Sequence, residues 1–117
     1  MNAIRTVTVT MAPLFCDLVT GLLAAHCNIH LVAKIDNRAA IEQRLQSLAP
    51  ELVLIGLGDG ESDEIASALA GSVPNARVIA FSSDNRHAFV HQLERPRRVL
   101  LDISPRQLVD AALGHDG

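Results

Sequence analysis

The stretch Ala49-Pro50-Glu51-Leu52-Val53-Leu54-Ile55-Gly56-Leu57-Gly58-Asp59-Gly60 decides the fold. Its apolar run from Leu52 to Ile55 follows a proline and is too short for a buried helix, so it predicts a central strand of a parallel sheet. The strand ends at Gly56 and leads into a glycine-rich loop, after which Ser62 is expected to cap a helix. In open parallel sheets, chemistry takes place at the carboxyl ends of such strands. Gly56 has no side chain, so we expect no nucleophile there.

Strands and helices alternate on both sides of this stretch. The expected strands are Ile4 to Thr10, Ile29 to Ile35, Leu52 to Ile55, Arg77 to Phe81 and Arg98 to Leu101. The expected helices run from Pro13 to His26, from Asp36 or Asn37 to Ser47, from Ser62 to Gly71, from Arg86 to Leu93 and from Ser104 to Gly114. Ser104, Pro105 and Gln107 form the pattern of a capping box at the start of the last helix. Five strand–helix units in succession predict a doubly wound α/β domain, because parallel neighbours need crossover connections.

Length and composition favour one globular domain. The 117 residues fit a single domain, residues 1–117, and we expect no output domain within the chain. The apolar fraction of 49% is ample for a core, and its aliphatic bias suits helices packed on both faces of a parallel sheet. Three phenylalanines are the whole aromatic set, and the net charge is −3. Neither feature suits a nucleic-acid-binding surface, so we expect no direct contact with DNA or RNA.

The chain carries no pattern typical of export or membrane insertion. No apolar stretch approaches the ~18 residues of a membrane span, and the N-terminal region alternates like a strand rather than a signal peptide. Cys16 and Cys27 lie eleven residues apart on one expected helix. At about 1.5 Å rise per residue their Cα atoms would be roughly 16 Å apart, too far for a disulfide. We therefore expect a cytoplasmic protein with two free thiols.

Three segments carry a resemblance to a known family. They are Ala12-Pro13-Leu14-Phe15 after the first strand, Ala49-Pro50-Glu51-Leu52-Val53-Leu54-Ile55 into the third, and Asp102-Ile103-Ser104-Pro105-Arg106-Gln107-Leu108-Val109-Asp110-Ala111-Ala112 at the end. With the spacing of the elements, they resemble a response-regulator receiver domain, most of all the receivers that precede LuxR-type helix-turn-helix output domains. The resemblance covers essentially the whole chain. It implies a flavodoxin-like (βα)5 fold with a five-stranded parallel sheet in the order 2-1-3-4-5.

The catalytic positions of that family are not kept here. The acidic pair that holds magnesium in receivers falls on Thr10 and Met11, and the phosphoacceptor aspartate falls on Gly56. Phosphoryl transfer to a carboxylate needs an acceptor oxygen and a divalent ion that neutralises the developing charge. Gly56 removes the first, and Thr10 with Met11 removes the anionic ligands for the second. The resemblance therefore implies a degenerate receiver, or pseudo-receiver.

Three further family positions lie at the ends of the fourth and fifth expected strands. The hydroxyl residue that senses the phosphoryl group falls on Ser82 and is kept in kind. The lysine after the fifth strand falls on Leu101, and the aromatic switch position falls on Arg98. Two of these three positions thus differ from the family pattern.

Other combinations of residues suggest weaker alternatives. The loop from Gly56 to Gly60 could cradle a phosphate at a helix N-terminus, but it lacks the spacing of known phosphate loops and is surrounded by acidic residues. His87 and His91 have a zinc-like spacing on a helix without an evident third ligand. Ser82-Ser83-Asp84 has no nucleophile-elbow sequence, and Ser83 or Asp84 is better explained as a helix cap. We therefore expect no metal site, no cofactor and no enzymatic activity.

One surface is expected to bind a partner. In receivers, partners or a second copy dock on the face made by the fourth helix, fifth strand and fifth helix. The only basic cluster of the chain, Arg95-Pro96-Arg97-Arg98, falls on this face. Arginine is favoured at interfaces because it pairs bidentately with carboxylates. The expected interaction face consists of Phe89, Leu93, Arg95, Arg97, Arg98 and Val99.

A receiver-like sequence that lacks the residues for phosphoryl transfer predicts a signalling module that works through protein–protein interaction and without phosphorylation. The expected partners are a protein of a bacterial signalling pathway and, through the same face, a second copy of the chain. Two alternatives stay open at this point. One is a small-molecule sensor that uses the crevice at the strand ends, and the other is a receiver fragment of a LuxR-type transcription regulator.

Overall fold

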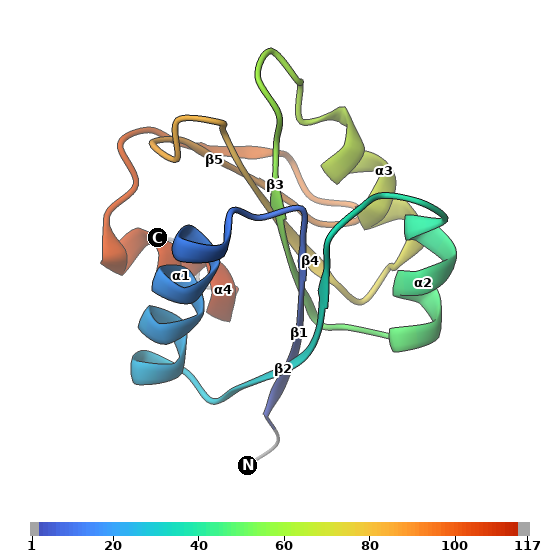
Figure 1. Cartoon of the computed structure of the whole chain (residues 1–117), viewed down its shortest axis with the longest axis horizontal. Helices are drawn as coiled ribbons and strands as arrows, with labels where there is room; N and C mark the ends of the chain where they lie inside the picture. The colour runs from blue at the N-terminus through green and yellow to red at the C-terminus, as the bar shows by residue number, and fades with distance from the viewer. Residues whose placement is uncertain (1–2, 115–117) are drawn as a thin grey trace.

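A computed structural model describes residues 3–114. The strands are β1 (Ile4–Val9), β2 (Ile29–Ile35), β3 (Leu52–Gly56), β4 (Arg77–Phe81), β5 (Ala88–His91) and β6 (Arg98–Leu100). The helices are α1 (Pro13–His26), α2 (Ile41–Leu48), α3 (Glu64–Ser72) and α4 (Pro105–Leu113). They form a three-layer α/β structure around one sheet (Figure 1).

The sheet has the order β2-β1-β3-β4-β5-β6. The first four strands of this order pair in parallel, as predicted. β5 pairs antiparallel with β4, and β6 pairs antiparallel with β5, so β6 runs in the same direction as β4. The predicted receiver-like architecture, with the order 2-1-3-4 followed by the expected fifth strand, is therefore present. It contains an additional sixth strand and four helices among the described residues.

Alternating side chains of the central strands build two cores. Val53 and Ile55 of β3 point to the side covered by α2 and α3, where they meet Leu45 and Leu69. Leu52 and Leu54 point to the opposite side and pack under α1 and α4. Figure 1 shows the two helix pairs on either side of the sheet. Because a parallel strand of this kind is apolar on both faces, the unbroken run in β3 predicted its central place correctly.

The prediction of a helix over Arg86 to Leu93 is wrong. This segment contains β5, and its residues alternate between buried Ala88 and Val90 and half-buried Phe89 and His91. That period of two, with aromatic and β-branched residues, is a strand pattern. The preceding turn suits a hairpin because Asn85 has φ of 62°, a left-handed conformation that asparagine tolerates well.

Two helix starts also differ from the predictions. The N-cap of α3 is Asp63 without a side-chain cap bond, while the Ser62 hydroxyl accepts a long 3.4 Å bond from the amide of Glu64. α2 begins only at Ile41, and the side chain of Asn37 accepts a bond from the amide of Ala39 in the loop before it. Arg38 lies in the loop before α2, and Glu61 lies in the loop before α3.

The last helix begins and ends as predicted. The Ser104 hydroxyl accepts a bond from the amide of Gln107, and the Gln107 side chain accepts one from the amide of Ser104, which completes the capping box. Gly114 then ends the helix with φ of 78°. A glycine is suited to this left-handed position because it has no Cβ. No helix among residues 3–114 is long and apolar enough to cross a membrane.

Candidate functional site: an ion pair fills the strand-end crevice

The carboxyl ends of β1 and β3 lie side by side and are joined by a polar contact. β1 pairs with β3 up to Val9 and Ile55, so Thr10 and Gly56 leave the two strands at neighbouring positions. Thr10 turns into a left-handed conformation with φ of 48°. Its hydroxyl donates a 2.9 Å hydrogen bond to the carbonyl oxygen of Gly56. Thr10, at one of the receiver's acidic-pair positions, and Gly56, at its acceptor position, are thus brought together.

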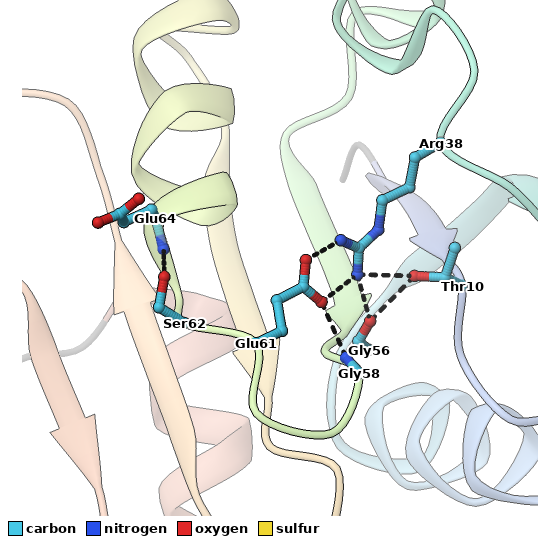
Figure 2. A network of polar contacts seen from close by, with 7 residues as sticks. All are labelled: Thr10, Arg38, Gly56, Gly58, Glu61, Ser62 and Glu64. Carbon is cyan, nitrogen blue, oxygen red and sulfur yellow. Dashed lines mark hydrogen bonds and ion pairs between the residues drawn. The ribbon is translucent and has the colours of Figure 1, made fainter.

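Arg38 fills the place where a receiver would hold its metal and phosphoryl group. It comes from the loop between β2 and α2, and its Nη2 donates to the Gly56 carbonyl oxygen at 2.8 Å. The same guanidinium forms a two-point ion pair with Glu61, with Nη2 at 2.8 Å from Oε1 and Nη1 bonded to Oε2. Figure 2 shows the guanidinium between the Glu61 carboxylate, Thr10 and Gly56. Planar guanidinium–carboxylate pairs of this kind are geometrically specific.

Glu61 is held from a second direction by the glycine-rich loop. Its Oε1 accepts a 2.8 Å bond from the amide of Gly58. The hydrogen bond from Arg38 lowers the pKa of Glu61 below its ordinary value of 4.5, partial burial opposes the shift, and the Gly58 amide adds to the lowering. The carboxylate is therefore ionised at neutral pH. Its bond with the Gly58 amide holds the loop from Gly56 to Glu61 in a turn, and its ion pair with Arg38 joins this loop to the loop between β2 and α2.

Gly56 is required by the close approach of the backbone after β1. A Cβ added at this position would lie 2.7 Å from the carbonyl oxygen of Thr10 and 3.3 Å from the Cα of Met11. A contact of 2.7 Å with backbone cannot be relieved by rotating a side chain. The structure therefore leaves no room for the aspartate side chain that a receiver carries here.

The remaining family positions lie apart from this crevice. Met11 packs, partly buried, against the core under α1 and α4. The Ser82 hydroxyl is bound within the β4–β5 turn, where it donates to Asp84 Oδ1 at 2.6 Å and accepts from the amide of His87 at 3.1 Å. The bond from Ser82 lowers the pKa of Asp84. Ser82 is thus used by the hairpin and does not point to a shared site.

Leu101 is separated from β4 by the additional strand. Phe81 at the end of β4 is level with Ala88 of β5, which is level with Leu100 of β6. Leu101 therefore reaches the same edge of the sheet as Ser82, but β5 lies between them. Its side chain is 65% exposed. A basic residue at this position would not stand beside the end of β4 as the family pattern requires.

The structure contains no candidate metal centre within residues 3–114, where no three His, Cys, Asp or Glu side chains form a group that could hold an ion. The two histidines of the zinc-like spacing take separate roles. His91 Nε2 lies 2.5 Å from Asp63 Oδ2, and both side chains are nearly buried. His87 lies in the β4–β5 turn, where its Nδ1 is 3.4 Å from the amide of Asp102. His91 therefore fastens the hairpin to the start of α3.

The expected interaction face is divided by the sheet. Phe89 and Val99 are cross-strand neighbours on the α3 side, where Arg97 lies over the Phe89 ring at 5.1 Å and its Nε is 3.2 Å from Asp63 Oδ2. Val99 is 44% exposed and Leu93, in the loop between β5 and β6, is 42% exposed. We call Phe89, Leu93, Arg97 and Val99 the hairpin surface.

The other two arginines of the set face the α4 side. Arg95 and Arg98 line a cavity of about 390 Å³ together with Arg77, Val90 and Ala111. Because successive residues of a strand point to opposite faces, Arg98 and Val99 cannot belong to one continuous surface. The sequence predicts all six residues on one face because residues 86–93, which include Phe89 and Leu93, are expected to form a helix.

Two residues of the crevice, Arg38 and Glu61, were not identified from the sequence. Both lie in loops, and their pairing depends on how the β2–α2 and β3–α3 connections fold toward each other. One signal was available for Arg38. It follows β2, which neighbours β1 in this topology, so its loop opens at the same edge of the sheet as Thr10 and Gly56.

Comparison with known proteins supports the fold. The sequence matches no protein-family model and no curated protein. Among solved structures, the chain is similar to the signal receiver domain of NarL from Mycobacterium tuberculosis, a protein described as a response regulator. The TM-score is 0.65 and the identity 20%, over 97% of this chain and 96% of that one. At this identity the similarity shows the fold, and the receiver-like architecture predicted from the sequence is confirmed.

Proposed function

We propose that this domain is a receiver-like signalling module of the bacterial cytoplasm that acts through protein–protein interaction, without phosphorylation and without enzymatic activity. The observation that carries the proposal is the Arg38–Glu61 ion pair at the end of β3. A receiver needs an open acidic pocket at this point for magnesium and the phosphoryl group. Here the pocket is filled by a cation that is already neutralised by its own carboxylate and bound to the Gly56 carbonyl.

The Arg38–Glu61 ion pair also bears on the two alternative functions, a small-molecule sensor and a receiver fragment of a LuxR-type regulator. A small-molecule sensor would use the strand-end crevice, but a ligand there would first have to break the two-point pair and the contacts of Arg38 to Gly56. The other alternative, a receiver fragment of a LuxR-type transcription regulator, concerns which domains are joined to this one. It is compatible with a domain that acts through protein interaction. We therefore favour protein interaction over ligand sensing.

The first test is addition of the reagents that activate receivers. We expect magnesium with beryllofluoride to leave the amide NMR shifts of Thr10, Gly56 and Ser82 unchanged, because residues 3–114 form no carboxylate group that could hold the ion and the centre of the crevice carries Arg38. Acetyl phosphate should add no mass to the intact protein. Saturable shifts clustered at these amides, or a gain of one phosphoryl group, would contradict the proposal. Phosphorylation-dependent chemical shifts of an active receiver serve as the positive control.

The second test concerns the hairpin surface, which offers exposed apolar groups beside an arginine that is held in place by Asp63 and Phe89. Such a pre-ordered guanidinium suits a partner with a carboxylate next to apolar side chains. We expect Val99→Glu to reduce recovery of a specific partner from cells at least about tenfold, since it puts a charge at the centre of the contact. Gln43→Glu, which adds the same charge on exposed α2, should recover the partner normally.

Partner recovery should be equal with and without acetyl phosphate. Recovery that requires acetyl phosphate would contradict phosphorylation independence. Equal recovery by wild type and Val99→Glu would show that the partner binds elsewhere.

A further inference from the structure

The outer side of α1 is apolar and open to solvent. The helix packs on the sheet through buried Cys16, Val19 and Leu23. At 3.6 residues per turn, Leu14, Leu18, Gly21 and Ala25 point directly away from that buried side. Leu14 is 86% exposed and Leu18 is 67% exposed, the highest values among the large apolar side chains of the described chain. Gly21 and Ala25 are exposed as well. We call these four residues the α1 seam.

The spacing of the seam is that of a helix-pairing surface. Its residues follow one another at intervals of four, three and four, as the apolar positions of a heptad repeat do. The seam carries no charge. Asp17 is the only Asp, Glu, Lys or Arg residue on α1. It lies to one side of the seam and pairs with Lys34 at 3.6 Å. A solvated helix normally presents charged and polar residues on this side.

The order of large and small residues along the α1 seam favours a second copy of the same helix as the binding partner. In an antiparallel pair of two α1 helices related by a two-fold axis, centred between residues 19 and 20, Leu18 of one copy lies opposite Gly21 of the other. In the same arrangement Leu14 lies opposite Ala25 of the second copy. Each large side chain thus meets a small one, and the pattern is self-complementary, as a two-fold contact requires. We infer that a second copy of this chain binds along the α1 seam.

The surroundings are compatible with this contact. A Cβ at Gly21 would meet nothing within 4 Å in the single chain, so the space in front of it is free for the Leu18 side chain of the second copy. On the α4 side, the seam continues into a groove of about 280 Å³ lined by Phe15, Leu22 and Leu108. Figure 1 shows α1 at the outside of the molecule beside α4. Asp17 of one copy would lie opposite Leu22 of the other, so the two Asp17 residues would be offset along the helix pair by about 7.5 Å and would not face each other.

The expected dimer is reversible. α1 is about 21 Å long at 1.5 Å per residue, so the seam and groove together make a contact at the small end of specific interfaces. We therefore expect dissociation in the micromolar to submillimolar range. The inference does not depend on the proposed function, because it concerns a different face from the strand-end crevice and the hairpin surface.

Sedimentation equilibrium over a wide concentration range tests the inference. The wild-type chain should show a monomer–dimer equilibrium. Gly21→Leu should weaken association at least about tenfold, because two leucines would then compete for one space. It should leave the monomer folded and at least as stable, since a good helix former replaces glycine where the added side chain meets no neighbour.

The exchange variant Leu18→Ala with Gly21→Leu separates this geometry from a general effect of α1. It moves the large residue to the other position of each facing pair, so association should return to within about threefold of wild type. Val99→Glu on the hairpin surface should not change association. A chain that stays monomeric at millimolar concentration overturns the inference. So does a dimer that Gly21→Leu leaves intact, that the exchange variant fails to restore, or that Val99→Glu dissolves.

Discussion

Replacing Gly56 by aspartate is expected to destabilise the domain by about 3 kcal/mol and to give no phosphorylation. The new Cβ would stand 2.7 Å from the Thr10 carbonyl oxygen, so the backbone after β1 must move. The new carboxylate would also enter a crevice where the guanidinium of Arg38 is already paired with Glu61. Urea unfolding measures the first effect, and intact mass after treatment with acetyl phosphate measures the second.

Two variants divide this effect into its parts. Gly56→Ala adds the Cβ without the charge and should account for most of the loss, about 2 kcal/mol. Gly71→Ala in α3, where an added Cβ meets nothing within 4 Å, should instead gain up to about 1 kcal/mol from better helix propensity. A Gly56→Asp protein of wild-type stability, or one that takes up a phosphoryl group, would show that the crevice is wider and less degraded than the structure indicates.

The parts of the fold that the sequence predicts well are those set by local pattern. The apolar run of β3 fixes a strand covered on both faces, and Pro13 and the Ser104 capping box fix the starts of α1 and α4. In each case a short-range rule and the tertiary environment favour the same structure. The order of the first four strands was implied by the resemblance to receivers, and the sheet has that order.

The β5 strand differs from the prediction because residues 86–93 lie between two apolar segments expected to be strands, and the alternation of strands and helices predicts a helix there. The alternation from Ala88 to His91 and the left-handed Asn85 favour a hairpin instead. The consequence for function is considerable, because a strand presents alternate residues to opposite faces. The expected six-residue interaction face therefore divides into the hairpin surface and the arginine-lined cavity.

The sequence predicts where the candidate site lies in the fold, but not which side chains fill it. The sequence places Thr10 and Gly56 at neighbouring strand ends, because both follow strands of one parallel sheet. It does not show that Arg38 and Glu61, 23 residues apart, meet there. Their contact depends on the path of two loops, which no periodic pattern records. From the sequence, Glu61 is only one of the acidic residues around the glycine-rich loop.

Removing Arg38 is the prediction that tests this crevice most directly. We expect Arg38→Ala to lower the free energy of unfolding at pH 7 by about 2 kcal/mol, because it leaves the Gly56 carbonyl and the Glu61 carboxylate with lost partners in a half-buried place. Arg44→Ala is the matched control. Arg44 is an exposed arginine of α2 whose contacts are 3.4 Å long, and its loss should cost less than about 0.5 kcal/mol.

The pH dependence of the same pair follows from the pKa of Glu61, which Arg38 lowers below 4.5 in the folded protein. A carboxyl group with a depressed folded-state pKa stabilises the fold above its unfolded pKa, and this contribution disappears as pH falls through the folded value. Wild type should therefore lose stability below about pH 4.5 that Glu61→Gln does not lose. Urea unfolding of both proteins at pH 7 and at pH 3 measures the difference, which should shrink at the lower pH. If Arg38→Ala and Arg44→Ala are equally stable, and wild type and Glu61→Gln respond alike to acid, the ion pair does not hold the crevice closed. The proposed independence from phosphorylation would then rest on Gly56, Thr10 and Met11 alone.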